Sequence, residues 1–408
     1  TWKRFKSGAV TSFSFVSPLG LTFLPKLISN SFSFTRPVEN PKNDGLKKWI
    51  TQGKKIDLSG IPLEEKVSMA ASALTGMGLT DNLAPLVLIT GHGSSSTNNP
   101  HASGLDCGAC GGHSGEKNAL TAQEILNDPE VREGLLAKGI QIPEETFFIA
   151  CLHDTTTDEI SVVAEHLVPE KFQNQLNSIK NSLELASNRT RIEKTQRLNI
   201  PIKQFKNLKE SFIKRAEDWS QIRPEWGLAG CNAFVIAPRE LTRGMNLKGK
   251  AFLQSYDWHS DPTFEVLEGI MTAPMVVTSW INLQYFASTT DNKRFGAGNK
   301  TLHNVTGGIG VLEGSGGDLR IGLPLQSVHD GEQFEHAPQR LNVIIDAPIE
   351  AINGILEKNA SIKQLCDNSW ISMLRLSNEG KVSHRYTKNL HWEELQTSNT
   401  NKNNLQTV

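Results

Sequence analysis

Two short apolar runs, each followed at once by polar residues, mark the first half of the chain. LVLIT (86–90) stops at Gly91, and TFFIACL (146–152) leads into the polar stretch HDTTTDE. Runs of this length and composition predict buried strands of a parallel sheet. The residues between them, 120–140, have the spacing of two helices broken near Pro129. Strand, helix and strand together predict a βαβ unit, which binds ligands at the carboxyl ends of its strands.

The remaining pattern predicts further elements around this unit. Residues 62–78 predict a helix that ends at glycine, and residues 169–222 predict a helical hairpin split near Pro201. The apolar runs 231–238 and 275–286 are interpreted as further core strands. We therefore expect an α/β fold with a mainly parallel sheet and a helical insertion.

Composition and charge narrow the class of protein. The 408 residues are 38% hydrophobic and 21% charged, which is typical of a globular protein. A formal net charge of −1 gives no general attraction for nucleic acid or an anionic membrane surface. Five cysteines do not indicate a secreted disulfide scaffold and favour a reducing compartment. The uncharged runs 7–25 and 269–290 are too rich in hydroxyl, amide and proline groups for a membrane span, so we expect buried strand with flanking loop there.

Residues 91–115, GHGSSSTNNPHASGLDCGACGGHSG, gather metal-binding side chains on one glycine-rich loop. Imidazoles and thiolates are preferred zinc ligands, and glycines let the backbone bend enough to bring nearby ligands together. His92 stands two residues beyond the predicted strand, so the sheet is expected to fix its position. Asp106 beside Cys107 is suited to orienting a ligand. The candidate ligands are His92, His101, Cys107, Cys110 and His113.

The residues alone leave four interpretations of this loop open. Cys107 and Cys110 form a CxxC pair, as in redox proteins, although the strand-to-helix context of such pairs is missing. A closed structural zinc site would use both cysteines, His113 and either His92 or His101. A metal-free loop would use its glycines for turns. The fourth interpretation, which we favour, is a catalytic zinc site with an open coordination position.

Five longer motifs extend from this loop through most of the chain. They are LVLITGHGSSSTNNPHASGLDCGACGGHSGEKNA, FFIACLHDTTTDE, RPEWGLAGCNAFVIAPR, IMTAPMVVTSWINLQYFASTTDN and KTLHNVTGGIGVLEGSGGDLRIGLPLQSV. These motifs resemble the DabA family, whose members are soluble subunits of an energy-coupled inorganic carbon pump. The resemblance covers most of residues 1–395 and implies the carboxyl-terminal half of a longer protein.

The resemblance implies a β-carbonic-anhydrase-like core within the α/β fold, and a zinc site like that of β-carbonic anhydrases, with two cysteines, one histidine and one aspartate. The histidine is His92, and the matching cysteine is Cys107. The other two implied ligands lie upstream in a Cys-x-Asp motif, which occurs nowhere in the 408 residues. Cys366 and Asp367 are adjacent and lie in a helical pattern, so we do not accept them as substitutes.

The resemblance also implies a function. Zinc lowers the pKa of bound water toward 7, and the resulting hydroxide attacks CO₂ to give bicarbonate. The implied partner is a DabB-like integral membrane subunit that translocates cations and couples an ion gradient to this reaction. The chain is then expected to be peripheral, on the cytoplasmic face of the cell membrane. Two other classes stay open: a non-catalytic interaction subunit with a structural zinc, and a CxxC thiol redox protein.

Pattern and resemblance together divide the chain into five segments. Residues 1–85 continue a larger upstream domain, and the start at Thr1 instead of Met also favours a fragment or a processed chain. The other four segments are the zinc-loop α/β unit at 86–168, the helical hairpin insertion at 169–222, the α/β continuation of the core at 223–395, and a disordered tail at 396–408.

Polar side chains elsewhere have simpler interpretations. Residues 153–158 either line the same crevice as His92 or form an Asx or Ser/Thr turn that caps a helix. Asp, His and Asp alternate at 257–261, but Asp261 before Pro262 predicts a helix N-cap more strongly than a metal ligand. The glycines of 307–324 predict turns and short strands.

Overall fold

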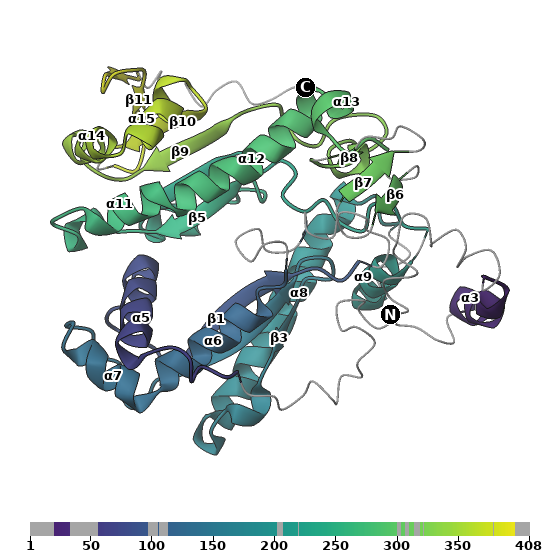
Figure 1. Cartoon of the computed structure of the whole chain (residues 1–408), viewed down its shortest axis with the longest axis horizontal. Helices are drawn as coiled ribbons and strands as arrows, with labels where there is room; N and C mark the ends of the chain where they lie inside the picture. Colours follow the sequence, from purple (N-terminus) through teal and green to yellow (C-terminus); the bar gives the residue numbers. More distant parts are fainter. Residues whose placement is uncertain are drawn as a thin grey trace. The chain divides into compact units, whose positions relative to one another are not determined.

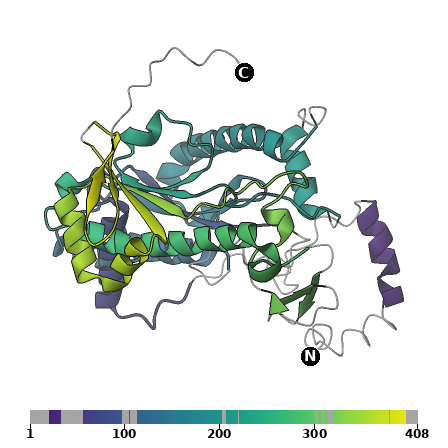
Figure 2. The same cartoon turned by 90° about the horizontal axis from the view of Figure 1, so that it is seen from above.

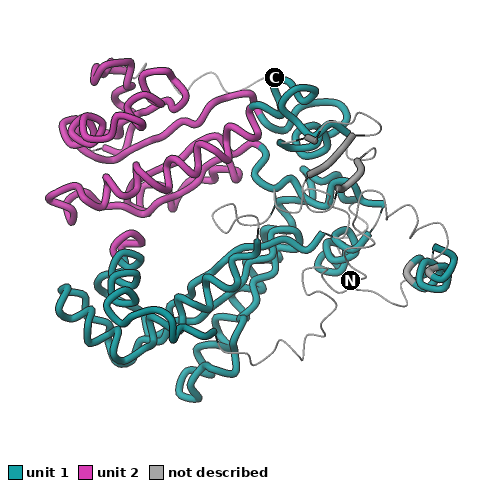
Figure 3. Tube along the Cα trace, in the orientation of Figure 1, with its two compact units in different colours: residues 1–74, 79–229, 287–336 teal, residues 75–78, 230–286, 337–408 magenta. Residues whose placement is uncertain are grey.

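The computed structural model divides the chain into two compact units (Figure 3). Unit 1 contains Thr1–Leu74, Leu79–Ala229 and Ala287–His336, and unit 2 contains Thr75–Gly78, Gly230–Phe286 and Ala337–Val408. The structure describes residues 20–32, 56–96, 105, 113–201, 207–218, 220–299, 303–306, 310–313, 319–320, 322–377 and 379–395. Helices and strands are mixed in both units, which confirms the predicted α/β class.

Unit 1 contains a three-stranded sheet in the order β1-β2-β3 (Figure 1). The strands are β1 (Leu86–Gly93), β2 (Phe147–Asp154) and β3 (Glu159–Val162). β1 and β2 are parallel, as predicted, whereas β3 pairs antiparallel with β2 after a tight turn. Both predicted strands run further than their apolar residues, into the polar side chains that follow. Both strands therefore carry polar side chains at their carboxyl ends.

The segment between β1 and β2 folds as two helices, as predicted. α6 (Glu116–Asn127) packs on β1 and β2, and α7 (Pro129–Leu136) follows after a one-residue break. Asp128 causes this break, because its side chain accepts a hydrogen bond from the Glu130 backbone N–H and Pro129 cannot continue α6. These helices and α5 (Leu63–Met77) bury one face of the sheet in a cluster that includes Leu74, Leu126, Val131, Leu135 and Phe148.

The opposite face of this sheet is covered by the start of the predicted helical hairpin. The hairpin consists of α8 (Gln173–Arg197) and α9 (Leu208–Glu217), which pack on each other. Short 3₁₀ turns, η4 (Glu165–Leu167) and η5 (Glu170–Phe172), lead into it. The buried cluster on this face contains Leu86, Ile149, Cys151, Val168, Phe172 and Leu176. Further along α8, the inward-facing residues become polar: Ser187, Arg191 and Thr195 are buried at helical spacing.

Unit 2 is built on a six-stranded sheet in the order β12-β11-β10-β9-β4-β5. The strands are β4 (Ala233–Ala237), β5 (Ala251–Ser255), β9 (Leu341–Ile345), β10 (Ile371–Leu376), β11 (Val382–Tyr386) and β12 (Trp392–Glu394). The neighbours from β5 through β10 are parallel, and β11 and β12 add an antiparallel edge. The strand predicted at 231–238 is confirmed as β4, and this sheet is mostly parallel.

Helices pack on one face of the six-stranded sheet (Figure 2). They are α11 (Glu265–Thr272), α12 (Pro274–Thr290), α14 (Ile349–Lys358) and α15 (Ala360–Asp367). Their apolar side chains form one cluster with residues of β4, β9 and β10, among them Ile236, Leu267, Met271, Val343 and Met373. This cluster is the core of unit 2.

The strand predicted at 275–286 is wrong, because these residues form most of α12. The buried positions recur at helical spacing, but several of them are polar, so the apolar pattern did not show the period. The buried set includes Met275, Thr278, Ser279, Asn282 and Tyr285. The Thr278 and Ser279 hydroxyls donate to the carbonyls of Pro274 and Val276, at 2.5 and 2.7 Å, which satisfies them inside the helix.

The helical stretch Glu265–Thr290 is, among the described residues, the one long and apolar enough to cross a membrane by length and composition. Its most apolar window has a mean hydropathy of 1.3, and 39% of that window is buried inside the protein. Core helices of soluble proteins have the same properties, so this stretch does not assign a location.

Smaller elements complete the described residues. The predicted turns and short strands at 307–324 include an antiparallel sheet of β6 (His303–Thr306), β7 (Gly310–Glu313) and β8 (Leu319–Arg320). The other short helices are η1 (Gly20–Phe23), α3 (Leu24–Ser31), α10 (Glu240–Arg243), η7 (Trp258–Ser260), α13 (Asn292–Phe295) and η9 (Leu325–Ser327). The tail predicted at 396–408 and most of the run 7–25 lie outside the described residues.

The end of β1 touches the start of α6 through two glycines. The Gly115 backbone N–H donates to the His92 carbonyl at 2.8 Å. A Cβ atom on Gly91 would lie 2.4 Å from the Gly115 carbonyl oxygen, so only glycine allows this approach. The loop that leaves the sheet after His92 therefore returns to the same point at Gly115.

We expect Gly91→Ala to lower the free energy of unfolding by about 1–3 kcal/mol, because the added methyl group overlaps backbone that cannot turn away. Urea unfolding followed by circular dichroism measures this change. Gly60→Ala is the matched control, since nothing lies within 4 Å of a Cβ at Gly60. Equal unfolding midpoints for the two variants would contradict the close packing of Gly91 against Gly115.

Candidate functional site

His92 and His153 lie side by side at the carboxyl ends of two parallel strands. They are partners in the β1–β2 register, so their side chains leave the same face of the sheet. Leu86 is buried on the face covered by α8. Alternate residues of a strand share a face, and positions 86 and 92 are an even number of residues apart. His92 and His153 therefore face α8. The sequence prediction that the two polar segments meet at one edge of the sheet is confirmed.

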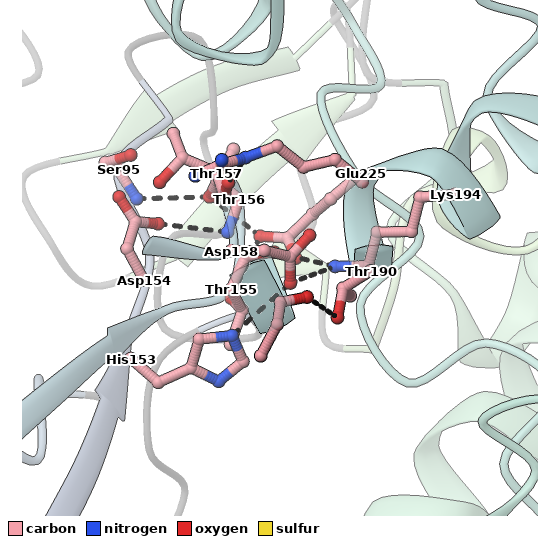
Figure 4. Close-up of polar contacts among 12 residues, drawn as sticks. Ser95, His153, Asp154, Thr155, Thr156, Thr157, Asp158, Thr190, Lys194 and Glu225 are labelled. Carbon is pink, nitrogen blue, oxygen red and sulfur yellow. Dashed lines mark hydrogen bonds and ion pairs between the residues drawn. The ribbon is translucent and has the colours of Figure 1, made fainter. Parts of the chain in front are cut away.

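The segment after His153 forms a turn held against the end of β1 (Figure 4). The Asp154 carboxylate accepts a hydrogen bond from the Thr156 backbone N–H at 3.0 Å, which is an Asx turn. The Thr155 N–H donates to the Gly93 carbonyl at 2.9 Å, and the Ser95 N–H donates to Thr156 Oγ1 at 3.1 Å. The predicted turn is thus present, but it joins β2 to β3 and caps no helix.

Asp158 is the buried centre of an ionic group in this turn (Figure 4). Its side chain is 3% exposed, and its Oδ1 atom lies 2.7 Å from Lys194 Nζ and 3.3 Å from His153 Nε2. Burial alone would raise the pKa of Asp158, but the hydrogen bond from His153 and the charge of Lys194 outweigh it and lower the pKa. Asp158 is therefore a carboxylate at neutral pH. Its second oxygen, Oδ2, is buried without a hydrogen-bond partner.

Glu225 approaches the same turn from the segment that follows the helical hairpin. Its Oε1 atom accepts hydrogen bonds from the hydroxyls of Thr156 at 2.9 Å and Thr155 at 3.2 Å. The pKa of Glu225 is raised to about 7: burial is the main cause and the nearby Asp154 adds to it, while Lys194 and the two hydroxyls oppose the rise. A carboxyl group with this pKa exchanges its proton at physiological pH.

The polar stripe of α8 closes this group from the other side. Arg191 is 1% exposed, and its Nε donates to the Thr157 carbonyl at 2.6 Å. Lys194 also donates to the Thr155 carbonyl at 3.2 Å. Two cations of one helix are thus directed at the β2–β3 turn. This stripe supplies positive charge where the carboxylates of Asp158 and Glu225 are buried.

The structure places only part of the predicted zinc site. His92 is half-buried at the end of β1, and His113 is exposed just before α6. Cys107, Cys110, His101 and Asp106 lie outside the described residues. Within the described part of the chain, no cluster of three or more His, Cys, Asp or Glu side chains is arranged to hold a metal ion. The described residues that flank this loop meet at the end of β1, where the Gly115 backbone N–H donates to the His92 carbonyl.

The three described cysteines are free and buried. Burial raises the pKa of the thiol to about 11 for Cys151 and about 12 for Cys231 and Cys366. Each thiol is therefore neutral, and among the described residues none belongs to a group of three or more His, Cys, Asp or Glu side chains that could hold a metal ion. Asp367, beside Cys366, accepts hydrogen bonds from Lys363, Tyr386 and the Asn389 backbone.

The alternating group at 257–261 has a structural role. Asp257 accepts from the His259 backbone N–H, and both side chains are more than half exposed. Asp261 is buried and accepts from the Tyr256 hydroxyl and from the Leu267 N–H, each at 3.0 Å. Asp261 thus accepts a backbone N–H from the first turn of α11, but the residue at the N-cap position is Phe264, so the prediction of Asp261 as the N-cap is wrong. α11 begins at Glu265, so Pro262 is not its first residue.

Sequence reasoning did not find Glu225 or Lys194. Glu225 lies in the motif RPEWGLAGCNAFVIAPR, but nothing in that motif or around Lys194 indicates a contact with the segment after His153, from which both are remote in sequence. One signal was present: Ser187, Arg191 and Thr195 repeat every four residues along α8, in a helix whose earlier inward positions are apolar. A polar stripe that continues an apolar one indicates that the helix end covers a polar site.

The protonation of Glu225 should govern how stability changes with pH. Its pKa is about 7 in the folded protein and 4.5 for an unperturbed glutamate, as in the unfolded chain, so the folded protein holds this proton more tightly. The contribution to stability is fully present below pH 4.5 and is lost as pH rises to about 7, by about 3 kcal/mol. Glu225→Gln stays neutral and should not show this loss. Urea unfolding of both proteins between pH 4.5 and 8 measures the difference.

Glu165→Gln is the control for this prediction, because Glu165 is about half exposed and pairs with Lys180 at the surface. It should follow the wild-type pH profile. Parallel profiles for wild type and Glu225→Gln would mean that Glu225 is ionised in the folded protein well below neutral pH.

Comparison with known proteins identifies the family of this chain. The family model described as "Probable inorganic carbon transporter subunit DabA" matches residues 1–371. A relative with that name in Chloroflexus aggregans is 50% identical over 401 residues, which are 96% of this chain and 48% of the relative. The relative in Roseiflexus castenholzii is also 50% identical over 401 residues, with the same coverage.

A third relative, "Probable inorganic carbon transporter subunit DabA 1" of Bradyrhizobium sp. (strain ORS 278), is 49% identical over 403 residues, 97% of this chain and 48% of the relative. The chain thus spans about half the length of the curated relatives it matches. No solved structure matches it. The match to the family model over most of the chain, together with these identities, shows that the chain belongs to the DabA family of probable inorganic carbon transporter subunits.

Proposed function

We propose that this chain carries half of a zinc site that hydrates CO₂ to bicarbonate, in the soluble subunit of an energy-coupled inorganic carbon pump. One observation carries the proposal: His92 is fixed at the end of β1, and the cysteine-bearing loop starts and returns there through the Gly115–His92 hydrogen bond. The relatives' name, inorganic carbon transporter subunit, supports the substrate class.

The donor set of this loop suits zinc. His92 and Cys107 would hold the ion, joined by a cysteine and an aspartate from the part of the relatives that this chain does not span. Zinc bound there would lower the pKa of a water molecule toward 7 and so supply hydroxide at neutral pH. An imidazole and a thiolate from this chain are the ligand types that zinc prefers.

The chain's own residues would orient this site and control its surroundings. The β1–β2 pairing fixes the backbone of His92, and the His92 carbonyl is held by Gly115. The Thr155 and Thr156 contacts to Gly93 and Ser95 fix the first residues of the loop beyond His92. On the face toward α8, the ion pair of Asp158 and Lys194 lies beside His153, whose Nε2 atom contacts the same Asp158 oxygen. Such preorganisation keeps ligands and solvent in one arrangement during turnover.

In the proposed complex, an integral membrane subunit that translocates cations would couple an ion gradient to hydration. Hydration close to equilibrium cannot by itself concentrate bicarbonate, so an energy source is required. We propose that the chain lies on the cytoplasmic face of the membrane and is held there by this partner. Its net charge of −1 gives little electrostatic attraction to anionic lipid.

The zinc content of variants tests the ligand assignment. In the full-length protein, we expect His92→Ala and Cys107→Ala to lose most of their zinc, because a site short of one ligand loses much of its binding energy. Cys110→Ala should retain zinc and serves as the matched cysteine control. Metal analysis by mass spectrometry after extensive dialysis is the measurement. Full zinc in Cys107→Ala together with loss in Cys110→Ala would overturn the assignment.

Membrane association is tested by fractionation of cells that express the full-length protein with or without its membrane partner. We expect the protein in the membrane fraction only when the partner is present. A peripheral contact should also be released by high salt or carbonate. Retention without the partner, resistant to both washes, would mean that a segment such as Glu265–Thr290 inserts into lipid by itself.

A further inference from the structure

We propose that a strand from the part of the relatives that this chain does not span pairs in parallel with the open edge of β1. The sheet of unit 1 has the order β1-β2-β3, so β1 pairs with β2 on one side, and no other described strand pairs with it. The chain covers 48% of the relative in Chloroflexus aggregans, so about half of such a protein lies outside it. The pairing itself does not depend on zinc or on CO₂ hydration.

β1 has the composition of an interior strand but the burial of an edge strand. Residues 86–90, LVLIT, form a continuous apolar run of the kind found where a parallel strand has neighbours on both sides. Three half-buried residues of β1 lie in register with three residues of β2 that are 0% exposed: Val87 with Phe148, Leu88 with Ile149, and Ile89 with Ala150. Thr90 is exposed. The apolar run of β1 therefore lacks a neighbour that the run of β2 has.

The backbone of β1 also presents hydrogen-bonding groups along this edge. The Phe147 N–H donates to the Pro85 carbonyl at 2.8 Å, and the Thr155 N–H donates to the Gly93 carbonyl at 2.9 Å. Alternate residues of a strand direct their backbone groups to the same neighbour, so the odd-numbered residues of β1 face β2. The even-numbered residues face the open edge, where no described strand bonds to them: Leu86, Leu88 and Thr90. Such an edge is a template for a further strand.

The helix before β1 indicates the side and the direction of the added strand. α5 leads into β1 and packs in one cluster with α6, which connects β1 to β2. Crossovers between parallel strands are right-handed, so two crossovers over the same face advance in the same direction across the sheet. A strand that leads into α5 therefore lies beside β1 on the side away from β2. Among the described residues before α5, 20–32 and 56–62, none is in a strand.

The surroundings of β1 also define the chemistry of the added strand. Helices cover both faces of the sheet, with α5, α6 and α7 on one side and the start of α8 on the other. The added strand should therefore be a short run of aliphatic residues, as β1 and β2 are. Because it is parallel, its carboxyl end lies at the same edge of the sheet as His92. The proposed zinc site lacks two ligands at this edge, and only this last consequence rests on the proposed function.

Hydrogen exchange of the full-length protein tests the pairing. We expect the amide hydrogens of Leu88 and Thr90 to be protected to the same degree as that of Ile89, which bonds to β2 and is the internal control. Removal of metal with a chelator should not change this protection. Fast exchange at Leu88 and Thr90 beside slow exchange at Ile89 would show an open edge and overturn the inference, even in a protein that binds zinc. Protection in a protein that binds no zinc supports this inference and instead overturns the proposed function.

Photo-crosslinking of the full-length protein identifies the strand. With p-benzoylphenylalanine in place of Thr90, we expect a crosslink within one polypeptide to an aliphatic segment outside these 408 residues. The same replacement at Leu185, which is 61% exposed on α8, is the control and should not react with that segment. A crosslink from position 90 to a second copy, to another subunit or to a segment of these 408 residues would overturn the assignment. Exchange of the unmodified protein remains the test if the bulky side chain disturbs folding.

Discussion

The parallel pairing of β1 with β2 is the constraint on which the whole site depends. It places His92 and His153 in register at one edge of a sheet and turns both toward α8. The contact of Gly91 with Gly115 then brings the long loop back to its starting point, because no side chain separates the strand end from α6. Every polar group described at this edge is attached to one of these two strand ends or packs against them. A loop rich in potential ligands thus has a rigid base, although most of its residues are glycine, serine and asparagine.

Burial of charge is the second organising feature of unit 1. The β2–β3 turn carries Asp154 and Asp158, and Glu225 adds a third carboxyl group with little solvent around it. Two cationic side chains of α8 contact this turn: Lys194 pairs with Asp158, and Arg191 donates to the Thr157 carbonyl. Two carboxyl groups close together respond differently, because Asp158 is bonded directly to Lys194 and His153, whereas Glu225 is buried and accepts hydrogen bonds only from two threonine hydroxyls. The pKa of Asp158 is lowered and that of Glu225 is raised, which separates a permanent charge from an exchangeable proton.

Much of this arrangement could be predicted from the sequence, and the failures have physical causes. The strands at 86–90 and 146–152, the break at Pro129 and the hairpin after residue 169 all follow from apolar period and local capping, and the structure confirms them. The segment 275–286 was predicted as a strand but is a helix. The prediction failed because Thr278, Ser279 and Asn282 occupy buried positions of that helix, so its apolar residues alone do not show the helical period. The meeting of His92 with residues 153–158 was predictable from the parallel sheet. Glu225 and Lys194 were not, since tertiary contacts alone bring them to the turn.

X-ray absorption at the zinc edge, measured on the full-length protein, tests the central claim most directly. In the proposed site, one cysteine and one histidine of this chain would bind the ion, with one cysteine and one aspartate from the part of the protein that the chain does not span. The spectrum should therefore show two sulfur ligands at about 2.3 Å and two nitrogen or oxygen ligands at about 2.0–2.2 Å. A shell of four sulfurs, a shell without sulfur, or a protein that binds no zinc would contradict the account.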